Sequence, residues 1–582
     1  MSDKKFKLCI TMAGAVSAGA YTAGVLDYLI ETLQLWEKAK AQNRAIGAGN
    51  PGYDDSIPMH DIEIDVMSGA SAGGISGTLT MLSLLDKNHT PVNSENPSGK
   101  DNRFYQSWVE MADDQHSDSL TKLLQRDDIV GTNTPESLLN TKAIEAIADK
   151  ALVLDEQSDY PAFVSKSLDL ILTTSNLRGL NFKVNFDGST GAGTVITNHG
   201  GFFRYKVQNE DFEHGVPNNG ANDDRLYYVF DPLDAKDINY IKNATLSTAA
   251  FPIGLKSREI EISSKYLERY PKYLFGRREG IEAMLDGEEV YKFNSIDGGL
   301  INNEPFGIGL KVINEKNPEI ENEEKDNYAV IMVDPFPNHD HEIEPYESKT
   351  DMLSIGKGMF KALRNQVMFN QDGILDALSL SDRTKFLIAP SRKVKKQIEG
   401  EEKWVHADNH LASAPISGFA GFFDKKLRQH DFMLGRLNCQ IFLRYYFAVK
   451  KENIEKRLGV AQTEQSFDRF GFAVPPRNPQ GEWFFPIIPD MKVKRAFDGE
   501  YDTENFSPED ASIPYPEYPR FDMNGFEKKY KRLIKKRISS LVRGLSGNRL
   551  LTGGFNLFYR GKTYKMLIEN IDKELKKAKL IR

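Results

Sequence analysis

The stretch IEIDVMSGASAGG, residues 62–74, contains the feature that decides the fold. Its first six residues predict a short buried strand, the small residues after them predict a sharp turn, and a helix is expected through Thr78–Leu85. Ser71 stands at the centre of the turn, between Gly69 and Gly73, in G-x-S-x-G spacing. Small neighbours let the strand and the helix approach each other closely. The pattern therefore predicts an exposed nucleophile at a tight strand–turn–helix elbow.

A second strand–turn–helix pattern begins near residue 6. Phe6–Met12 predicts a buried strand, and a helix with an apolar face is expected from about Gly19 to Lys40. Between them lies a loop of small residues that begins at Gly14. Such a turn leaves backbone N–H groups unpaired at the start of a helix, where the helix dipole favours negative charge. We therefore expect this loop to bind an oxyanion.

A third segment, Tyr291–Asp297, predicts a strand that ends in a carboxylate before Gly298 and Gly299. An aspartate before glycines is common in ordinary turns. Together with the elbow and the early loop, however, Asp297 supplies the one group still needed, a base for the Ser71 hydroxyl. The three segments predict a serine hydrolase that works without a histidine.

In this order the three segments resemble the motifs of the patatin-like phospholipases, which carry a glycine-rich oxyanion loop, a G-x-S-x-G elbow and a D-G-G/A motif. The resemblance implies that Ser71 is the nucleophile and Asp297 the base of a Ser–Asp dyad. It implies an oxyanion hole formed by Gly14 with the amides of Ala15 and Val16. The expected activity is hydrolysis of carboxylic esters of lipids or phospholipids through an acyl-enzyme.

The resemblance covers roughly residues 5–340 and has one departure. The family loop usually reads G-G-G-x-R/K-G, whereas residues 14–19 read GAVSAG, so two glycines and the basic residue are replaced. Backbone donors survive these changes, but a cation near the oxyanion is lost. Residues 244–252 resemble the family's small-residue helix, and residues 418–436 and 485–489 resemble segments of the larger bacterial members.

Two other interpretations remain open. Ser71, Asp297 and His430 follow the Ser–Asp–His order of an α/β-hydrolase triad, although no His-Gly-Gly loop precedes the elbow. The charged run around His430 instead predicts a surface or salt-bridge role for it. The altered loop also fits a non-catalytic lipid-binding or scaffold protein of the same fold, although the presence of both Ser71 and Asp297 argues against it.

The composition is typical of a globular chain, with 40% hydrophobic and 27% charged residues among 582. No 18-residue apolar run and no signal-peptide core is found. Two cysteines, Cys9 and Cys439, are too few for a disulfide framework. His406 and His410 lack a third ligand for zinc. We expect a cytoplasmic protein without a metal or cofactor.

Strands that alternate with helices predict an α/β fold, with a mostly parallel central sheet covered by helices and a mainly helical C-terminal region. We expect a catalytic domain over 1–345, a partly helical extension with a Pro-rich connection over 346–520, and a basic helical tail over 521–582. Residues 188–224 read as a polar, glycine-rich insertion.

The net charge is −8, yet the tail is rich in lysine and arginine, with apolar residues at helical spacing. Its helix is expected either to dock on the protein's own body or to contact anionic lipid as a peripheral membrane element. No nucleic-acid recognition motif accompanies the charge, so nucleic acid is not an expected partner.

Overall fold

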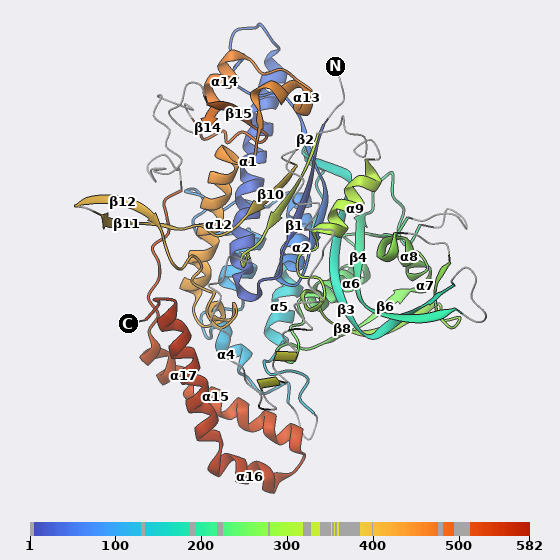
Figure 1. Ribbon diagram of the computed structural model, residues 1–582, viewed down its shortest axis with the longest axis vertical. Helices are drawn as coiled ribbons and strands as arrows, with labels where there is room; N and C mark the ends of the chain where they lie inside the picture. The colour runs from blue at the N-terminus through green and yellow to red at the C-terminus, as the bar shows by residue number, and fades with distance from the viewer. Residues whose placement is uncertain are drawn as a thin grey trace.

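The computed structural model describes residues 5–129, 134–185, 193–217, 225–276, 280–317, 327–337, 384–398, 400–474, 481–493 and 513–581, together with a few residues between 351 and 362. A ten-stranded mixed sheet forms the centre of the molecule (Figure 1). Among the described residues, no helix combines the length and the apolar character needed to cross a bilayer.

Five neighbouring strands of this sheet are parallel, as the alternating pattern predicted. In spatial order they are β10 (Lys385–Ile388), β9 (Tyr328–Val333), β1 (Phe6–Met12), β2 (Ile62–Gly69) and β3 (Val164–Val184). Parallel strands need covered faces and are accordingly almost continuously apolar. In β1, six of seven residues are buried.

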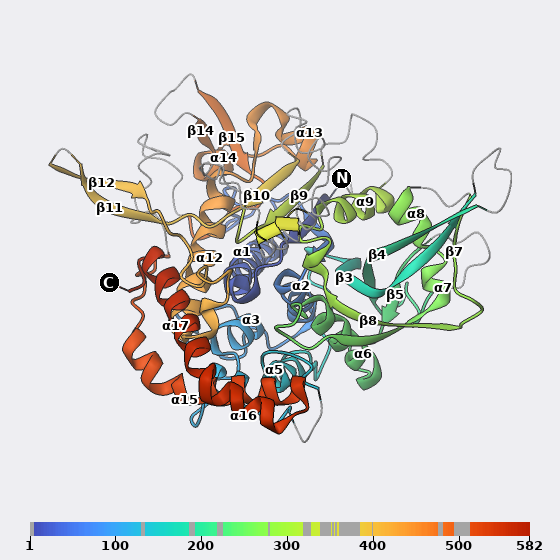
Figure 2. The ribbon, with the colours of Figure 1, turned by 60° about the horizontal axis from the view of Figure 1, so that its bottom comes forward.

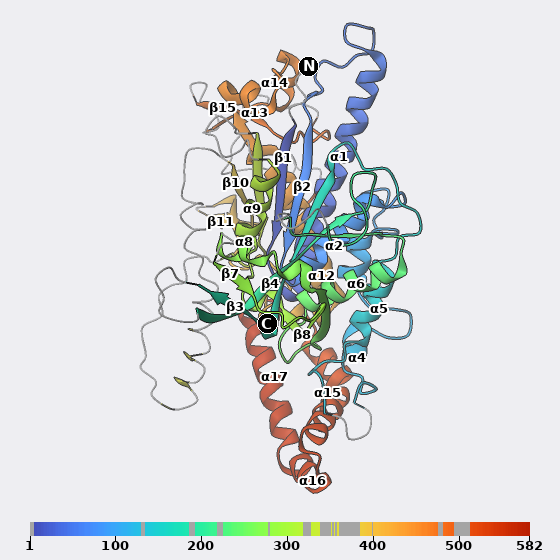
Figure 3. The ribbon, with the colours of Figure 1, turned by 90° about the vertical axis from the view of Figure 1, so that its right-hand side faces the viewer.

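Helices cover both faces of this parallel part. Gly77 of α2 (Ala72–Leu85) packs on Met12 and Leu170, whereas Gly309 of α9 (Phe306–Lys316) packs on Cys9. Cys9 and Met12 are three positions apart on one strand, so their side chains point to opposite faces. Figure 3 shows the sheet between these helices. The predicted α/β architecture is confirmed.

The other side of the sheet is mostly antiparallel. Its strands are β4 (Thr194–Val207), β5 (Tyr228–Phe230), β6 (Arg258–Ser263), β7 (Ile281–Ala283) and β8 (Val290–Asp297). Strands β4 and β5, however, pair in parallel. Strand β3 pairs with both β4 and β8. The interpretation of residues 188–224 as an insertion was therefore wrong for the part that forms β4, because threonines and aromatic residues there complete a long hairpin with β3.

Short helices surround the sheet and the elbow. They are α3 (Arg103–Tyr105), α4 (Ser119–Leu123), α5 (Lys142–Ala151), α6 (Ala235–Thr248), α7 (Ser264–Leu267) and α8 (Tyr270–Phe275).

The chain after β10 is mainly helical but also contains two small sheets. A hairpin, β11 (Lys393–Ile398) with β12 (Glu401–His406), precedes the long helix α12 (Lys425–Tyr445). A three-stranded sheet then follows, made of β13 (Ala448–Lys450), β14 (Phe472–Val474) and β15 (Glu482–Pro486), with α13 (Ile454–Leu458) and α14 (Glu464–Phe470) between its strands.

Helix α12 packs directly on α1 (Gly19–Ile46), which joins the extension to the N-terminal half. A Cβ atom at Gly24 would overlap the backbone of Phe432, and one at Gly435 would overlap the backbone of Tyr21, so the helices cross at glycines. Buried Arg436 pairs with Asp27 across this contact. One hydrophobic core therefore includes residues of both regions. The predicted boundary at residue 345 lies outside the described residues.

The basic tail forms three helices, α15 (Met523–Ser546), α16 (Arg549–Phe558) and α17 (Arg560–Lys577), at the lower end of the molecule in Figure 1. Helix α15 buries Phe526, Tyr530 and Ile534 in a second hydrophobic core, together with Leu120 of α4 and residues of α17. The apolar face that the sequence indicated therefore docks on the protein's own body.

Candidate active site

The sheet brings the three sequence motifs to one edge. Met12 pairs with Gly69, and Gly69 pairs with Leu172, so β1, β2 and the parallel part of β3 point the same way at this level. Asp297 at the end of β8 pairs with Thr174, two residues further along β3. The carboxyl ends of parallel strands are the usual location of sites in open α/β sheets.

The elbow holds Ser71 in a backbone conformation that residues other than glycine rarely adopt. Its φ is 52° and its ψ is −122°, at the N-terminal cap of α2. The Ser71 N–H donates to the Thr248 hydroxyl at 3.0 Å, so it is already engaged. A Cβ atom at Gly73 would overlap the main-chain oxygen of Met12, which explains why a glycine is needed there.

The Ser71 hydroxyl donates a hydrogen bond of 2.8 Å to Oδ2 of Asp297, and both side chains are buried. The other carboxylate oxygen, Oδ1, accepts from the Gly299 N–H at 2.7 Å. The main-chain carbonyl of Asp297 accepts from the Ser175 hydroxyl at 2.8 Å. Hydrogen bonds therefore hold both the main chain and the carboxylate of Asp297, and one carboxylate oxygen faces the nucleophile.

The loop after β1 lies directly against Ser71. A Cβ atom at Gly14 would lie 3.0 Å from the Ser71 Cβ and would overlap Oδ1 of Asn303. The Gly14 N–H donates to the Asn303 carbonyl at 3.2 Å. No described residue accepts a hydrogen bond from the N–H of Ala15 or Val16, and Val16 has a positive φ of 51°. The loop thus has two backbone N–H groups without an acceptor among the described residues, directly after Gly14, which lies against the serine.

The C-terminal extension supports this loop from behind. The Ser17 N–H donates to the Gly418 carbonyl at 3.1 Å, and the Ser17 hydroxyl donates to the same oxygen. The same hydroxyl accepts from the Gly421 N–H at 3.1 Å. Ile416 and Ser417, which precede Gly418, both have positive φ values. The segment that resembled the larger bacterial members therefore contacts the candidate oxyanion loop.

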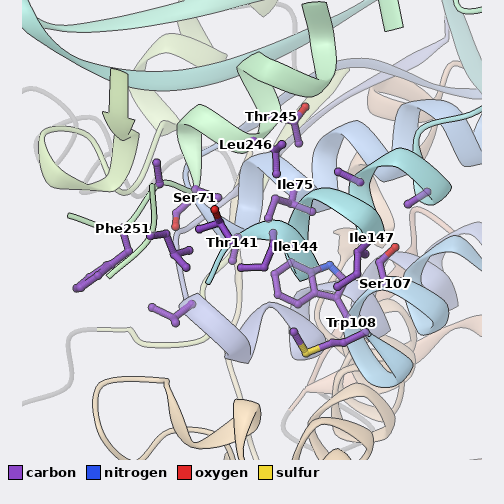
Figure 4. A pocket seen from close by; sticks show the side chains of 18 of the residues that line it. Ser71, Ile75, Ser107, Trp108, Thr141, Ile144, Ile147, Thr245, Leu246 and Phe251 are labelled. Carbon is purple, nitrogen blue, oxygen red and sulfur yellow. The ribbon is translucent and has the colours of Figure 1, made fainter. Parts of the chain in front are cut away.

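An apolar pocket opens beside Ser71 (Figure 4). Figure 4 shows Ile75, Trp108, Ile144 and Phe251 around it. The extension closes one wall with Phe419, which packs edge-on against Phe251 at a centroid distance of 5.2 Å. Further apolar lining comes from Leu79, Met111, Ile147, Ala148, Leu152, Leu246, Leu255 and Phe422.

His430 does not hydrogen-bond with Ser71. Its Nδ1 lies 2.8 Å from Oδ1 of Asp431, and its Nε2 has no partner among the described residues. Its ring packs edge-on against Tyr518. Asp431 also accepts from the backbone of Ala412 and Ser413. His430 therefore pairs with an acidic neighbour, as in the second of the two roles that the charged run predicted, and the pair is buried.

Sequence reasoning missed several residues that build the site. Thr248 anchors the elbow. The segment that contains it, residues 244–252, was recognised only by its resemblance to the family's small-residue helix, and this resemblance gave Thr248 no role. The pocket wall on α5 had a signal in the sequence. Ile144, Ile147, Ala148 and Ala151 follow helical spacing, and all four line the pocket. The contact between Ser17 and Gly418 had no signal in the sequence, because it joins positions 401 residues apart.

Comparison with known proteins identifies the family of this chain. Residues 10–310 match the family model described as patatin-like phospholipase. The chain is also 31% identical over 578 residues to a protein of Sinorhizobium fredii (strain NBRC 101917 / NGR234) named "Uncharacterized protein y4iI". That similarity covers 94% of this chain and 76% of the relative.

The chain belongs to the patatin-like phospholipase family. At the level of the family, this membership supports lipid acyl hydrolysis.

Proposed function

We propose that this protein is a serine lipid acyl hydrolase that cleaves carboxylic esters through a Ser71–Asp297 dyad. The observation that carries the proposal is the 2.8 Å hydrogen bond from the Ser71 hydroxyl to Asp297, at the base of an apolar pocket. A nucleophile and its base within hydrogen-bond reach are the geometry that activated serines require.

In the first step, Ser71 Oγ attacks the ester carbonyl while its proton passes to Oδ2 of Asp297. The resulting oxyanion is stabilised by backbone N–H groups of the Gly14–Val16 loop. The donors of Ala15 and Val16 are available as they stand, whereas the Gly14 N–H first has to leave Asn303. Collapse of the intermediate breaks the ester bond, and the proton on Asp297 passes to the leaving alkoxide. An acyl-enzyme on Ser71 remains.

In the second step, water attacks the acyl-enzyme. Asp297 takes a proton from the water, and the same oxyanion contacts form again. When the intermediate collapses, the proton returns to Ser71 and a carboxylic acid is released. No histidine takes part, and both steps use one carboxylate.

The pocket favours a long apolar acyl group over a polar one. Apart from the hydroxyl groups of Ser107, Thr141 and Thr245, the uncharged side chains around Ser71 are aliphatic or aromatic. The two cations at the lining are already paired, Arg258 with Glu145 and Lys256 with Glu136. An acyl chain in this pocket also excludes water, which strengthens the oxyanion contacts.

The His430 triad is the less favoured alternative, because that ring is bound to Asp431 and Tyr518. A non-catalytic lipid-binding protein is also less favoured, since an inactive scaffold has no need for the strained serine and its aligned carboxylate. We further propose peripheral contact with anionic membranes through the basic tail, and cytoplasmic location remains a prediction.

The test is hydrolysis of a panel of phospholipid, lysophospholipid and triacylglycerol esters by the wild type and by Ser71→Ala, Asp297→Asn and His430→Ala. Fatty acid release that disappears in the first two variants and persists in the third supports the dyad. Loss in His430→Ala with an intact circular dichroism spectrum supports the triad instead. A wild type that is inactive on every ester contradicts the proposal.

A further inference from the structure

Helix α16 exposes its apolar face, which is the reverse of the usual arrangement in a globular protein. Two of its polar side chains face α15, where Asn556 accepts from the Ser539 hydroxyl at 2.6 Å and Thr552 lies 3.3 Å from Ser546. The opposite face is apolar and open. Leu550, Leu557 and Phe558, at positions i, i+7 and i+8, are 85%, 76% and 67% exposed. Amphipathic helices ordinarily bury such a face.

The charge around α16 is strongly positive. Between Glu527 and Glu569 the sequence has no acidic residue, although the whole chain has a net charge of −8. Two cations of this segment pair with acidic residues of the body, Lys529 with Asp118 and Arg537 with Asp128. The segment contains twelve lysines and arginines, namely Lys528, Lys529, Lys531, Arg532, Lys535, Lys536, Arg537, Arg543, Arg549, Arg560, Lys562 and Lys565.

Hydrogen bonds also connect the tail to the rim of the Ser71 pocket. Buried Arg537 of α15 donates to the Leu138 carbonyl at 2.9 Å, and the Leu138 N–H donates to the Ile253 carbonyl at 2.8 Å. Ile253 follows Phe251 of the pocket lining by two residues and is 76% exposed. Figure 2 shows α16 and α5, whose inner face lines the pocket, on the same end of the molecule.

We propose that α16 is an interfacial helix that inserts its apolar face into an anionic lipid bilayer and so brings the pocket rim at Ile253 to the lipid surface. An exposed apolar stripe between basic residues is the composition of helices that lie in the membrane interface. This inference specifies the membrane contact proposed above. That the bilayer also supplies the substrate rests on the proposed hydrolase activity, whereas binding to the bilayer does not.

Other occupants of this face fit the observations less well. A second copy of the chain would bring two groups of twelve cations together, and like charges repel. Nucleic acid would satisfy the positive charge but would leave Leu550, Leu557 and Phe558 without an apolar partner. A lipid surface satisfies both the charge and the apolar stripe.

Flotation of full-length protein with vesicles tests the proposal. The Ser71→Ala protein is mixed with phosphatidylcholine vesicles with and without phosphatidylglycerol, so that no hydrolysis alters the lipid. We expect binding to the anionic vesicles that weakens with salt. In the same background, the triple variant Leu550→Ser/Leu557→Ser/Phe558→Ser is expected to bind at least about tenfold more weakly, because three apolar side chains no longer enter the bilayer.

A matched control replaces exposed apolar residues elsewhere, with Leu177→Ser, Leu233→Ser and Val460→Ser in one protein. It should bind as the parent does. A second variant, Lys562→Ser/Lys565→Ser, tests the charge without changing the apolar stripe and should bind more weakly than the parent. With an active Ser71, the α16 triple variant should hydrolyse a water-soluble ester at the wild-type rate but vesicle lipid more slowly.

Unchanged binding of the α16 triple variant overturns the inference. It is also overturned if light scattering shows a wild-type dimer that the triple variant dissociates, or if duplex DNA displaces the protein from anionic vesicles. Failure of the proposed function is distinguishable, since a wild type that binds vesicles through α16 yet cleaves no ester leaves the membrane inference standing.

Discussion

Two neighbouring strand–turn–helix units build the site, and they are supported in different ways. The elbow after β2 presents the Ser71 side chain, and its strand, turn and helix are contiguous in sequence. The loop after β1 presents backbone N–H groups and is held by Asn303 and by Gly418 of the C-terminal extension. Both turns contain a non-glycine residue with positive φ, Ser71 at 52° and Val16 at 51°.

The two turns differ in which residues maintain their conformation, neighbours in the sequence or residues of a distant segment. The elbow needs glycines at fixed spacing, because Met12 lies too close to Gly73 for a side chain. The first loop has alanine and valine where the family usually has glycine, and its conformation is maintained by contacts with Ser17 from residues 418–421. We infer that contacts from the extension maintain the loop conformation that, in other family members, the glycines of the loop itself allow.

The largest effect is expected at the elbow and its base. Ser71→Ala and Asp297→Asn should each lower kcat/KM for a water-soluble ester by at least about 10³-fold, because nucleophile and base act as a unit. Steady-state kinetics of both single variants and the double variant measure this. A double variant that is far worse than either single variant would show that the two groups act independently.

A smaller but large effect is expected where the two units touch. Gly14→Ala places a Cβ atom against Asn303 and Ser71, so kcat should fall by about 10²-fold, the cost of displacing catalytic groups by roughly an ångström. Gly561→Ala is the control, since no atom lies near its added Cβ. Wild-type kcat in Gly14→Ala would show that the loop is not in contact with the reacting atoms.

The support from the extension is tested by Ser17→Ala. This change removes the hydroxyl that joins Gly418 and Gly421, and it should lower the free energy of unfolding by about 1–2 kcal/mol. It should also lower kcat with little change in KM, because the oxyanion loop loses its backing. Ser83→Ala is a matched control, since that buried hydroxyl has no partner among the described residues. Equal behaviour of the two variants contradicts the supporting role.

His430→Gln should separate stability from activity in the same extension. The ring is buried against Tyr518 and paired with Asp431, so its replacement should lower the free energy of unfolding by about 1–3 kcal/mol. Ester hydrolysis by the folded variant should stay within about twofold of wild type, because the ring pairs with Asp431 whereas the Ser71 hydroxyl pairs with Asp297. Urea unfolding and kinetics below the transition measure the two quantities. A folded but inactive variant would contradict the prediction that His430 contributes to stability and not to catalysis.

The smallest expected effect is a pH dependence of stability near the loop after β1. Asp334 follows β9, beside the Ala13 N–H bond to Val333, and burial raises its pKa from 3.8 to about 6. A carboxyl group with a raised pKa in the folded state binds its proton more tightly than in the unfolded chain. Its contribution to stability is therefore complete below about pH 4 and is lost as the pH rises to about 6. Asp334→Asn should flatten this part of the stability profile in urea titrations, and an unchanged slope would contradict the assignment.

Sequence reasoning found the local parts of this molecule and missed the long-range ones. Strand β1 and the elbow were predicted because burial and turn chemistry are written in contiguous residues. Strand β4 was missed since its polar, glycine-rich neighbourhood hides a pairing with β3 that only the folded sheet provides. The bond from Ser71 to Thr248 and the contact of Ser17 with Gly418 join distant segments, so no spacing rule indicates them.

The tail illustrates the same limit. Helical spacing indicated the face of α15 that carries Tyr530 and Ile534, and that face is buried in the structure. It did not reveal that α16 presents its leucines outward, because the orientation of a helix depends on its neighbours.

The most direct test of the central claim is labelling with a fluorophosphonate probe, which reacts with activated serines, followed by peptide mass spectrometry. We predict one adduct per chain on Ser71, loss of labelling in Asp297→Asn, and normal labelling in His430→Gln. Absence of an adduct on the folded wild type, or an adduct on Ser71 that persists in Asp297→Asn but disappears in His430→Gln, would contradict a Ser–Asp dyad.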